Sequence, residues 1–182
     1  MFFDTGRPCG LSQWLSNKAR IYQAEDLCQV WVLASCANED DVLGYFTLSA
    51  HSLVTTSVEK SHRAASPQNR GVVGTHQALP AHLLGKFALD SSVQGRGVGP
   101  LLMACVYDRY LLSAQSGGSK LLVLEAREAA LVEYYHGVYG FVAATGPPLG
   151  GLTTMYKTRA SIRVDLDAVL QGAGVPLTEG ER

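Results

Sequence analysis

The stretch KFALDSSVQGRGVGPLLM, residues Lys86–Met103, predicts a strand, a glycine-rich turn and a helix in direct succession. Residues 87–89 are a short apolar run of strand character, and residues 90–92 are typical of a turn. The glycines fall within Gln94–Gly99. Pro100 suits the first turn of a helix, because its missing N–H would have no intrahelical partner there. The helix is expected to continue to about residue 114.

A turn of this composition is suited to bind an anion. Glycines let the backbone approach a ligand closely, and the first amides of a helix lack partners at the positive end of its dipole. Arg96 adds a full positive charge. The spacing Gln94-x-x-Gly97-x-Gly99 matches neither the dinucleotide fingerprint nor the P-loop. Taken alone, it predicts either a phosphate or pyrophosphate site or a tight loop that caps a helix.

Composition indicates a globular protein of one domain. The chain has 182 residues, of which 47% are hydrophobic and 17% charged. The four cysteines and five histidines show neither C-x-x-C nor the spacing of metal ligands, so we expect reduced thiols in a cytoplasmic protein without a metal. The acidic Asp4 argues against a signal peptide. No apolar run approaches the ~20 residues of a membrane span, so no membrane is expected as partner.

The charge is small and unevenly distributed. The net charge is −1, and residues 164–182 contain four acidic residues and one basic residue. The preceding chain is therefore mildly basic, which permits contact with RNA without arguing for it. Six cations could form a basic rim or could simply be solvated. They are Lys18, Arg20, Lys60, Arg63, Arg70 and Arg96.

Periodicity and turn residues predict the remaining elements. The expected order is a helix at 11–22, a hairpin of strands 28–35 and 42–49, a long surface loop at 55–80, the strand–turn–helix described above, a strand at 120–124, a helix at 125–135, strands at 141–144 and 153–164, and a short helix at 165–170 before a frayed end. This order is that of an α/β fold with a central mixed β-sheet flanked by helices. We expect a single domain over residues 1–160, followed by an acidic extension at 161–182.

Three separated stretches resemble the GNAT N-acetyltransferases. Gln94–Gly99 resembles the acetyl-CoA pyrophosphate motif of that family, and EAALVEYYHGVYGF at residues 128–141 looks like its terminal helix. FDTGRPCGLSQWLSNKA at residues 3–19 is similar to the TacT-like toxins of type II toxin–antitoxin modules, as is LGKFALDSSVQGRGVG at 84–99, with Lys86 in place of Arg. The family has a strand before the first of these toxin-like stretches, which is expected to be missing here or supplied otherwise.

The resemblance implies a GNAT fold and acetyl transfer from acetyl-CoA to the α-amino group of an aminoacyl-tRNA, which blocks translation. It implies that the turn holds the pyrophosphate and that the preceding strand pairs with the pantetheine arm, one of its amides facing the thioester carbonyl. The cofactor-binding residues are then Phe87, Ala88, Leu89, Gln94, Gly95, Arg96, Gly97, Val98 and Gly99.

A tyrosine near the end of the terminal helix is the implied acid, which protonates the CoA thiolate as it leaves. Counted forward from Glu125, this position is Tyr135, whereas counted back from Gly140-Phe141 it is His136. The chain has one additional residue between these two reference points. Tyr135 is the preferred candidate and His136 the competing one.

The resemblance also implies partners. These are a ribbon-helix-helix antitoxin, operator DNA bound only through that antitoxin, and a second copy of the chain in a homodimer. Two alternatives stay open: a GNAT enzyme that acetylates a small-molecule or protein amine, and a CoA-binding module without turnover.

Overall fold

A six-stranded mixed sheet forms the centre of the computed structural model, which describes residues 3–64, 66–146 and 150–172. The strand order is β1-β2-β3-β4-β6-β5, and only the β3–β4 pair is parallel. This confirms the predicted mixed sheet. The strands are β1 (Gln29–Ala34), β2 (Val42–Val54), β3 (Ala78–Leu89), β4 (Leu121–Ala126), β5 (Val142–Ala143) and β6 (Thr153–Thr158).

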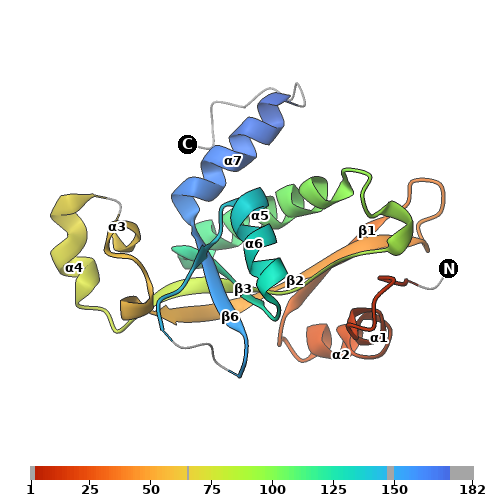
Figure 1. Cartoon of the computed structure of the whole chain (residues 1–182), viewed down its shortest axis with the longest axis horizontal. Coiled ribbons are helices and arrows are strands. Elements are labelled where there is room, and N and C mark those ends of the chain that lie inside the picture. The colour runs from red at the N-terminus through yellow and green to blue at the C-terminus, as the bar shows by residue number, and fades with distance from the viewer. Residues whose placement is uncertain (1–2, 65, 147–149, 173–182) are drawn as a thin grey trace.

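Helices cover both faces of the sheet (Figure 1). They are α1 (Leu11–Asn17), α2 (Ala19–Ala24), α3 (Lys60–Arg63), α4 (Arg70–Gly74), α5 (Val98–Gly117), α6 (Ala129–Tyr139) and α7 (Arg159–Gly172). The main core lies between the sheet and α5, α6 and α7, where Leu102, Val106 and Ile162 are each at most 1% exposed. On the opposite face, Trp14 of α1 stacks on Tyr45 of β2.

Strand β4 is buried on both faces, as its continuous apolar sequence predicts. Leu122 and Leu124 belong to the core beneath α5, whereas Leu121 and Val123 pack on the other face with Leu53 and other apolar residues. Among the helices of the described residues, none is long and apolar enough to cross a lipid bilayer.

The predicted helix at 11–22 is divided into α1 and α2 by Lys18. Lys18 ends the first helix and begins the second, with φ −123° and ψ −27°. Apolar periodicity continues across this residue, so the sequence pattern alone does not show the break. Both helices face the sheet. Trp14 of α1 stacks on Tyr45 of β2, and Ala19 of α2 is buried.

The segment predicted as a long surface loop at 55–80 is structured. It contains two 3-10 turns, α3 and α4, and β3 already begins at Ala78. Val58 is 1% exposed in the apolar cluster on the second face of the sheet. Burial of that face explains why a segment rich in polar residues is ordered: it covers apolar side chains that water would otherwise reach.

Two predicted boundaries on the C-terminal side are wrong. Glu125 and Ala126 continue β4, because they pair with Thr154 and Thr153 of β6, so α6 begins only at Ala129. The strand expected over 153–164 ends at Thr158, whose hydroxyl accepts the Ser161 N–H at 3.2 Å and caps α7. This helix is longer than the one expected at 165–170. The end of the predicted tail lies outside the described residues.

A buried lysine fastens α7 to the rest of the molecule. Lys157 of β6 is 5% exposed and pairs with Asp165 of α7 at 2.6 Å. Its ammonium also donates to the Tyr139 carbonyl at the end of α6 and lies 5.7 Å from the centre of the Tyr107 ring. One side chain therefore links α7, the end of α6 and α5.

Replacing Asp165 should destabilise the protein, because it leaves the Lys157 ammonium buried without a counter-charge. For Asp165→Asn we expect a loss of about 1–3 kcal/mol in the free energy of unfolding, measured by urea denaturation at neutral pH. Asp167→Asn is the control, since Asp167 is exposed on the same helix. Equal stabilities of the two variants would contradict this role of the ion pair.

Candidate functional site

Strands β3 and β4 pair over only a short distance. Residues 81–83 of β3 pair with residues 121–123 of β4, and beyond them the described residues of the two strands form no further pairs with each other. Their outer edges stay paired, β3 with β2 and β4 with β6. The inner edges of residues 84–89 and 124–126 are therefore free for another partner. We call this place the β3–β4 opening.

A bulge at Gly85 coincides with the end of this pairing. Thr47 of β2 pairs with Lys86, but the next residue, Leu48, pairs with Leu84, so Gly85 is an additional residue in β3. A Cβ at Gly85 would lie 3.1 Å from the Thr47 hydroxyl oxygen. A bulge bends its strand and increases the local twist. Our sequence interpretation missed it, although a glycine within an apolar strand is a recognised signal for a bulge.

The glycine-rich turn lies between the end of β3 and the start of α5. Gly95 and Gly97 have φ +72° and +79°, in the left-handed region that favours glycine, and a Cβ at either would meet only open space. Gly97 is the N-cap of α5. The turn is thus exposed at the first amides of a long helix, which is the geometry predicted for an anion site.

Gln94 holds this turn in place through its side chain. The amide nitrogen donates to the carbonyls of Leu89 and Thr5, both at 2.9 Å. The first contact closes the turn onto the end of β3, and the second reaches a residue far away in the sequence. The side-chain amide of Gln94 therefore orients the turn, while the amides of residues 95–99 remain to face a ligand.

Asp90 makes the second link between the turn and the N-terminal segment. Its carboxylate accepts the Asp4 N–H and the Ser92 N–H at 2.9 Å each and the Ser92 hydroxyl at 2.6 Å. Burial alone would raise the pKa of Asp90, but these hydrogen bonds outweigh it and hold the pKa below its usual value. Residues 3–10 and the glycine turn, two of the three GNAT-like stretches, are thereby joined.

The tyrosines of α6 meet the first turn of α5. The hydroxyls of Tyr134 and Tyr139 are 3.3 Å apart. A Cβ at Gly99 would lie 3.3 Å from the Tyr139 hydroxyl and 3.7 Å from that of Tyr134. Gly99 therefore allows α5 and α6 to approach, and it brings the third GNAT-like stretch to the turn.

Tyr135 points into the main core, unlike the exposed Tyr134. Its ring lies 6.0 Å from Phe141 and 6.1 Å from Tyr139, and it packs on the same apolar cluster as Phe87 and Leu89. Burial, with a smaller effect from Tyr134, raises the pKa of Tyr135 to about 12. This phenol therefore keeps its proton at neutral pH.

The additional residue near the end of α6 is accommodated in its last turn. The Phe141 N–H donates to the Tyr135 carbonyl six residues earlier, whereas a Schellman end spans five. Gly140 ends the helix with φ +66°, but Gly137 lies inside it. His136 is exposed, and its Nδ1 donates to the Phe141 carbonyl at 2.9 Å, because a carbonyl oxygen can only accept.

The six predicted cations do not form one rim. Lys60, Arg63 and Arg70 belong to the segment between β2 and β3, at the opposite end of β3 from Arg96 in the turn (Figure 1). The Arg63 Nε also donates to the Val58 carbonyl at 2.8 Å, so this side chain helps to hold the backbone of its own segment. Lys18 and Arg20 lie on the N-terminal helices.

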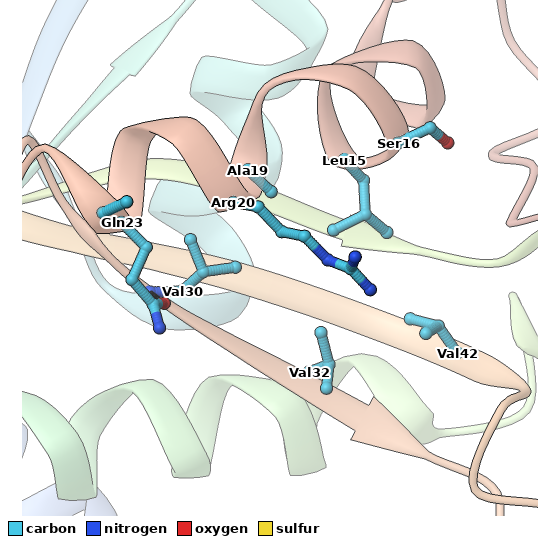
Figure 2. Close-up of a pocket in the computed structure, with 9 residues that line it drawn as sticks. Leu15, Ser16, Ala19, Arg20, Gln23, Val30, Val32 and Val42 are labelled. Carbon is cyan, nitrogen blue, oxygen red and sulfur yellow. Dashed lines mark hydrogen bonds between the residues drawn. The ribbon is translucent and has the colours of Figure 1, made fainter.

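A groove of about 810 Å³ runs between α1–α2 and the outer strand β1 (Figure 2). Leu15, Val30 and Val32 line it, and the Arg20 side chain extends over it. The Gln23 side chain accepts the Val30 N–H at 3.0 Å and occupies part of the strand edge. In the strand order, β2 separates β1 from β3. The groove is therefore distinct from the β3–β4 opening.

The stability contributed by Asp90 should depend on pH. Because its pKa is lower in the folded state, the contribution is complete above the unfolded value of about 4 and is lost as pH falls through the folded value. We expect Asp90→Asn to be less stable than the parent protein by about 1–3 kcal/mol at pH 7 and by less at pH 3. Urea denaturation at both pH values measures this, with the exposed Asp108→Asn as control. A pH-independent difference would disprove the assignment.

Closing the approach at Gly99 should weaken the binding of acetyl-CoA, the ligand that the family resemblance implies for the glycine turn. Valine there would displace the hydroxyls of Tyr134 and Tyr139 from the first turn of α5, at a cost of about 1–3 kcal/mol in stability. Calorimetric titration with acetyl-CoA should show a higher Kd for Gly99→Val than for Gly117→Val. Gly117 is the matched control, since a Cβ there meets nothing within 4 Å. Equal affinities would refute this role of Gly99.

No family model matches the chain, but solved structures of bacterial toxins share its fold. AtaT complexed with acetyl-methionyl-tRNAfMet has a TM-score of 0.74 at 22% identity, covering 89% of this chain and 88% of that chain. A tyrosine-to-phenylalanine mutant of AtaT, bound to the C-terminus of the antitoxin AtaR and acetyl-CoA, has a TM-score of 0.66 at 23% identity, covering 89% and 86%. The KacTA–DNA complex has a TM-score of 0.70 at 22% identity, covering 91% and 89%. The chain therefore has the GNAT fold of the toxins AtaT and KacT.

Proposed function

We propose that this protein is an N-acetyltransferase toxin that transfers an acetyl group from acetyl-CoA to the α-amino group of an aminoacyl-tRNA. The observation that carries the proposal is the meeting of the glycine turn with the Tyr134 and Tyr139 hydroxyls beside the free end of β3, where Tyr135 packs on the same cluster as Phe87 and Leu89. The fold shared with AtaT, whose structure includes acetyl-methionyl-tRNAfMet, supports the choice of acceptor.

In this reaction the turn and the end of β3 bind acetyl-CoA. The amides of residues 95–99 hold the pyrophosphate, with Arg96 adding charge, and Gln94 keeps the turn in position. The pantetheine arm pairs with the free edge of Phe87, Ala88 and Leu89. A backbone amide there donates to the thioester carbonyl oxygen as negative charge develops on it, and such a donor contributes about 3–4 kcal/mol.

Tyr135 is the proposed general acid. The neutral amine attacks the thioester carbon, and the tetrahedral intermediate then collapses with loss of the CoA thiolate, which takes a proton. The phenol is protonated at neutral pH and can donate this proton, although its raised pKa, about 12, makes it a weaker acid than an exposed tyrosine. His136 is the competing candidate, and its Nδ1 is already engaged with the Phe141 carbonyl.

The dispersed cations favour a second candidate, the acetylation of a small-molecule or protein amine. Nucleic-acid binding draws much of its free energy from lysines and arginines on phosphates, and the six cations considered above lie on separate parts of the fold. The experiment below therefore includes acceptors of both kinds.

We further propose that the protein acts in the cytoplasm, as a homodimer, under control of a ribbon-helix-helix antitoxin that alone contacts operator DNA. The shared fold with AtaT bound to the C-terminus of AtaR and with KacT in the KacTA–DNA complex supports an antitoxin partner and operator DNA. The location, the homodimer and the fold of the antitoxin rest on the family resemblance of the sequence.

Transfer of radiolabelled acetyl from acetyl-CoA tests the proposal. Label should appear on a pool of charged tRNA and be absent from uncharged tRNA, and Tyr135→Phe should lower the rate by ~10²–10⁴-fold. Tyr107→Phe is the control, since Tyr107 is buried on α5 away from the turn. A full rate for Tyr135→Phe with a loss for His136→Gln would reassign the acid. Label on small amines alone would favour the second candidate, and binding of acetyl-CoA without any transfer would mean a module without turnover.

A further inference from the structure

Three charged residues stand around the β3–β4 opening, and the proposed reaction gives none of them a role. Lys86 follows the bulge in β3, Glu125 lies on β4 just beyond its last residue paired with β3, and Arg127 follows β4. Continuing the register of residues 81–83 with 121–123 would place Gly85 opposite Glu125. Lys86 and Glu125 therefore flank the opening from its two sides.

Lys86 and Glu125 lie away from the face covered by α5 and α6. Leu122 and Leu124 contribute to the core beneath α5, so the alternation of a strand turns Glu125 to the opposite face, where it is exposed. On that face the Lys86 ammonium lies 5.5 Å from the centre of the Trp14 ring of α1. In the proposed reaction the turn that binds CoA belongs to α5, so this face is open to the second substrate.

The charges act on one another but do not neutralise one another. Burial lowers the pKa of Lys86 and the positive charge of Arg127 lowers it further, whereas Cys28 and then Glu125 raise it. The Lys86 ammonium donates to the Gly85 carbonyl at 3.2 Å. Among the described residues, Glu125 and Arg127 form no ion pair and no side-chain hydrogen bond. The opening thus presents two cations and one carboxylate with unused bonding capacity.

We propose that Glu125, Lys86 and Arg127 form the acceptor-recognition site of this enzyme, an assignment that rests on the proposed function. Glu125 accepts a hydrogen bond from the neutral α-amino group and orients it, and Lys86 and Arg127 bind the phosphate of the 3′-terminal nucleotide. An aminoacylated RNA end carries an amine and a phosphate a single nucleotide apart. A free amino acid or a protein N-terminus lacks that phosphate, so the charge pattern suits an aminoacyl-nucleotide best.

Steady-state kinetics with two acceptors test this assignment. The acceptors are a pool of charged tRNA and the methyl esters of the same amino acids, which have the amine but no phosphate. The variants are Glu125→Gln, Lys86→Gln, Lys86→Arg and Arg127→Gln. Glu133→Gln and Arg109→Gln, at exposed positions on α6 and α5, are the controls. The Kd for acetyl-CoA should stay unchanged in every variant.

Removing a cation and removing the carboxylate should change the kinetics in different ways. Lys86→Gln and Arg127→Gln should each raise KM for charged tRNA roughly tenfold and leave the kinetics of methyl esters unchanged, while Lys86→Arg keeps the phosphate contact. Glu125→Gln should raise KM for both acceptors about tenfold. Filter binding at several salt concentrations gives the slope of the logarithm of the tRNA association constant against the logarithm of salt concentration. This slope should become shallower by about one unit for each cation removed.

The outcomes separate this inference from the proposed function. Transfer to charged tRNA at control rates in all variants would overturn the recognition site and leave the function standing. Equal losses on both acceptors for Lys86→Gln and Arg127→Gln would overturn the phosphate assignment. If the parent protein acetylates nothing, yet binds charged tRNA more tightly than uncharged tRNA only while Glu125 is present, the function falls and the recognition site stands.

Discussion

The early end of the β3–β4 pairing is the constraint on which the rest of the site depends. A buried strand edge with unpaired N–H and C=O groups is costly, so it persists only where another partner or water satisfies it. Here the outer edge of each strand is fully paired, β3 with β2 and β4 with β6, and the Gly85 bulge bends β3 where the inner pairing stops. Strands β3 and β4 can therefore separate at one end while the strand order of the sheet is kept. The free edge is what the proposed pantetheine pairing uses.

Contacts between distant parts of the chain hold the elements around this opening. Asp90 and Gln94 tie the N-terminal segment to the glycine turn, through Asp4 and Thr5. On the other side, Lys157 links the end of α6 to Asp165 of α7. Both links place a charged or polar side chain on backbone N–H or C=O groups. They give the first and last described segments of the chain a role in placing the turn and the tyrosines.

The two faces of the sheet have different chemistry at the opening. Toward α5 and α6 it is aromatic and apolar, with Phe87, Leu89 and Tyr135 packed on the main core. Toward α1 it is charged, with Lys86 beside Trp14 and Glu125 exposed on β4. In the proposed reaction acetyl-CoA and the acceptor would approach from opposite faces and meet between the strands. Burial of Tyr135 on the apolar face raises the pKa of its phenol, which is therefore protonated at neutral pH.

The sequence by itself determined the features that depend on residues close to one another along the chain. The strand–turn–helix at 86–103, the β1–β2 hairpin and the doubly buried β4 all follow from local periodicity, glycine and proline. The end of β4 and the change from β6 to α7 were misplaced, because strand pairing with Thr153 and Thr154 and the Thr158 cap decide them. The glycine turn and the tyrosines of α6 were found as motifs. Their meeting at Gly99, the Gly85 bulge and the grouping of Lys86, Glu125 and Arg127 were decided by tertiary structure alone, since each joins residues that only the packed sheet brings together.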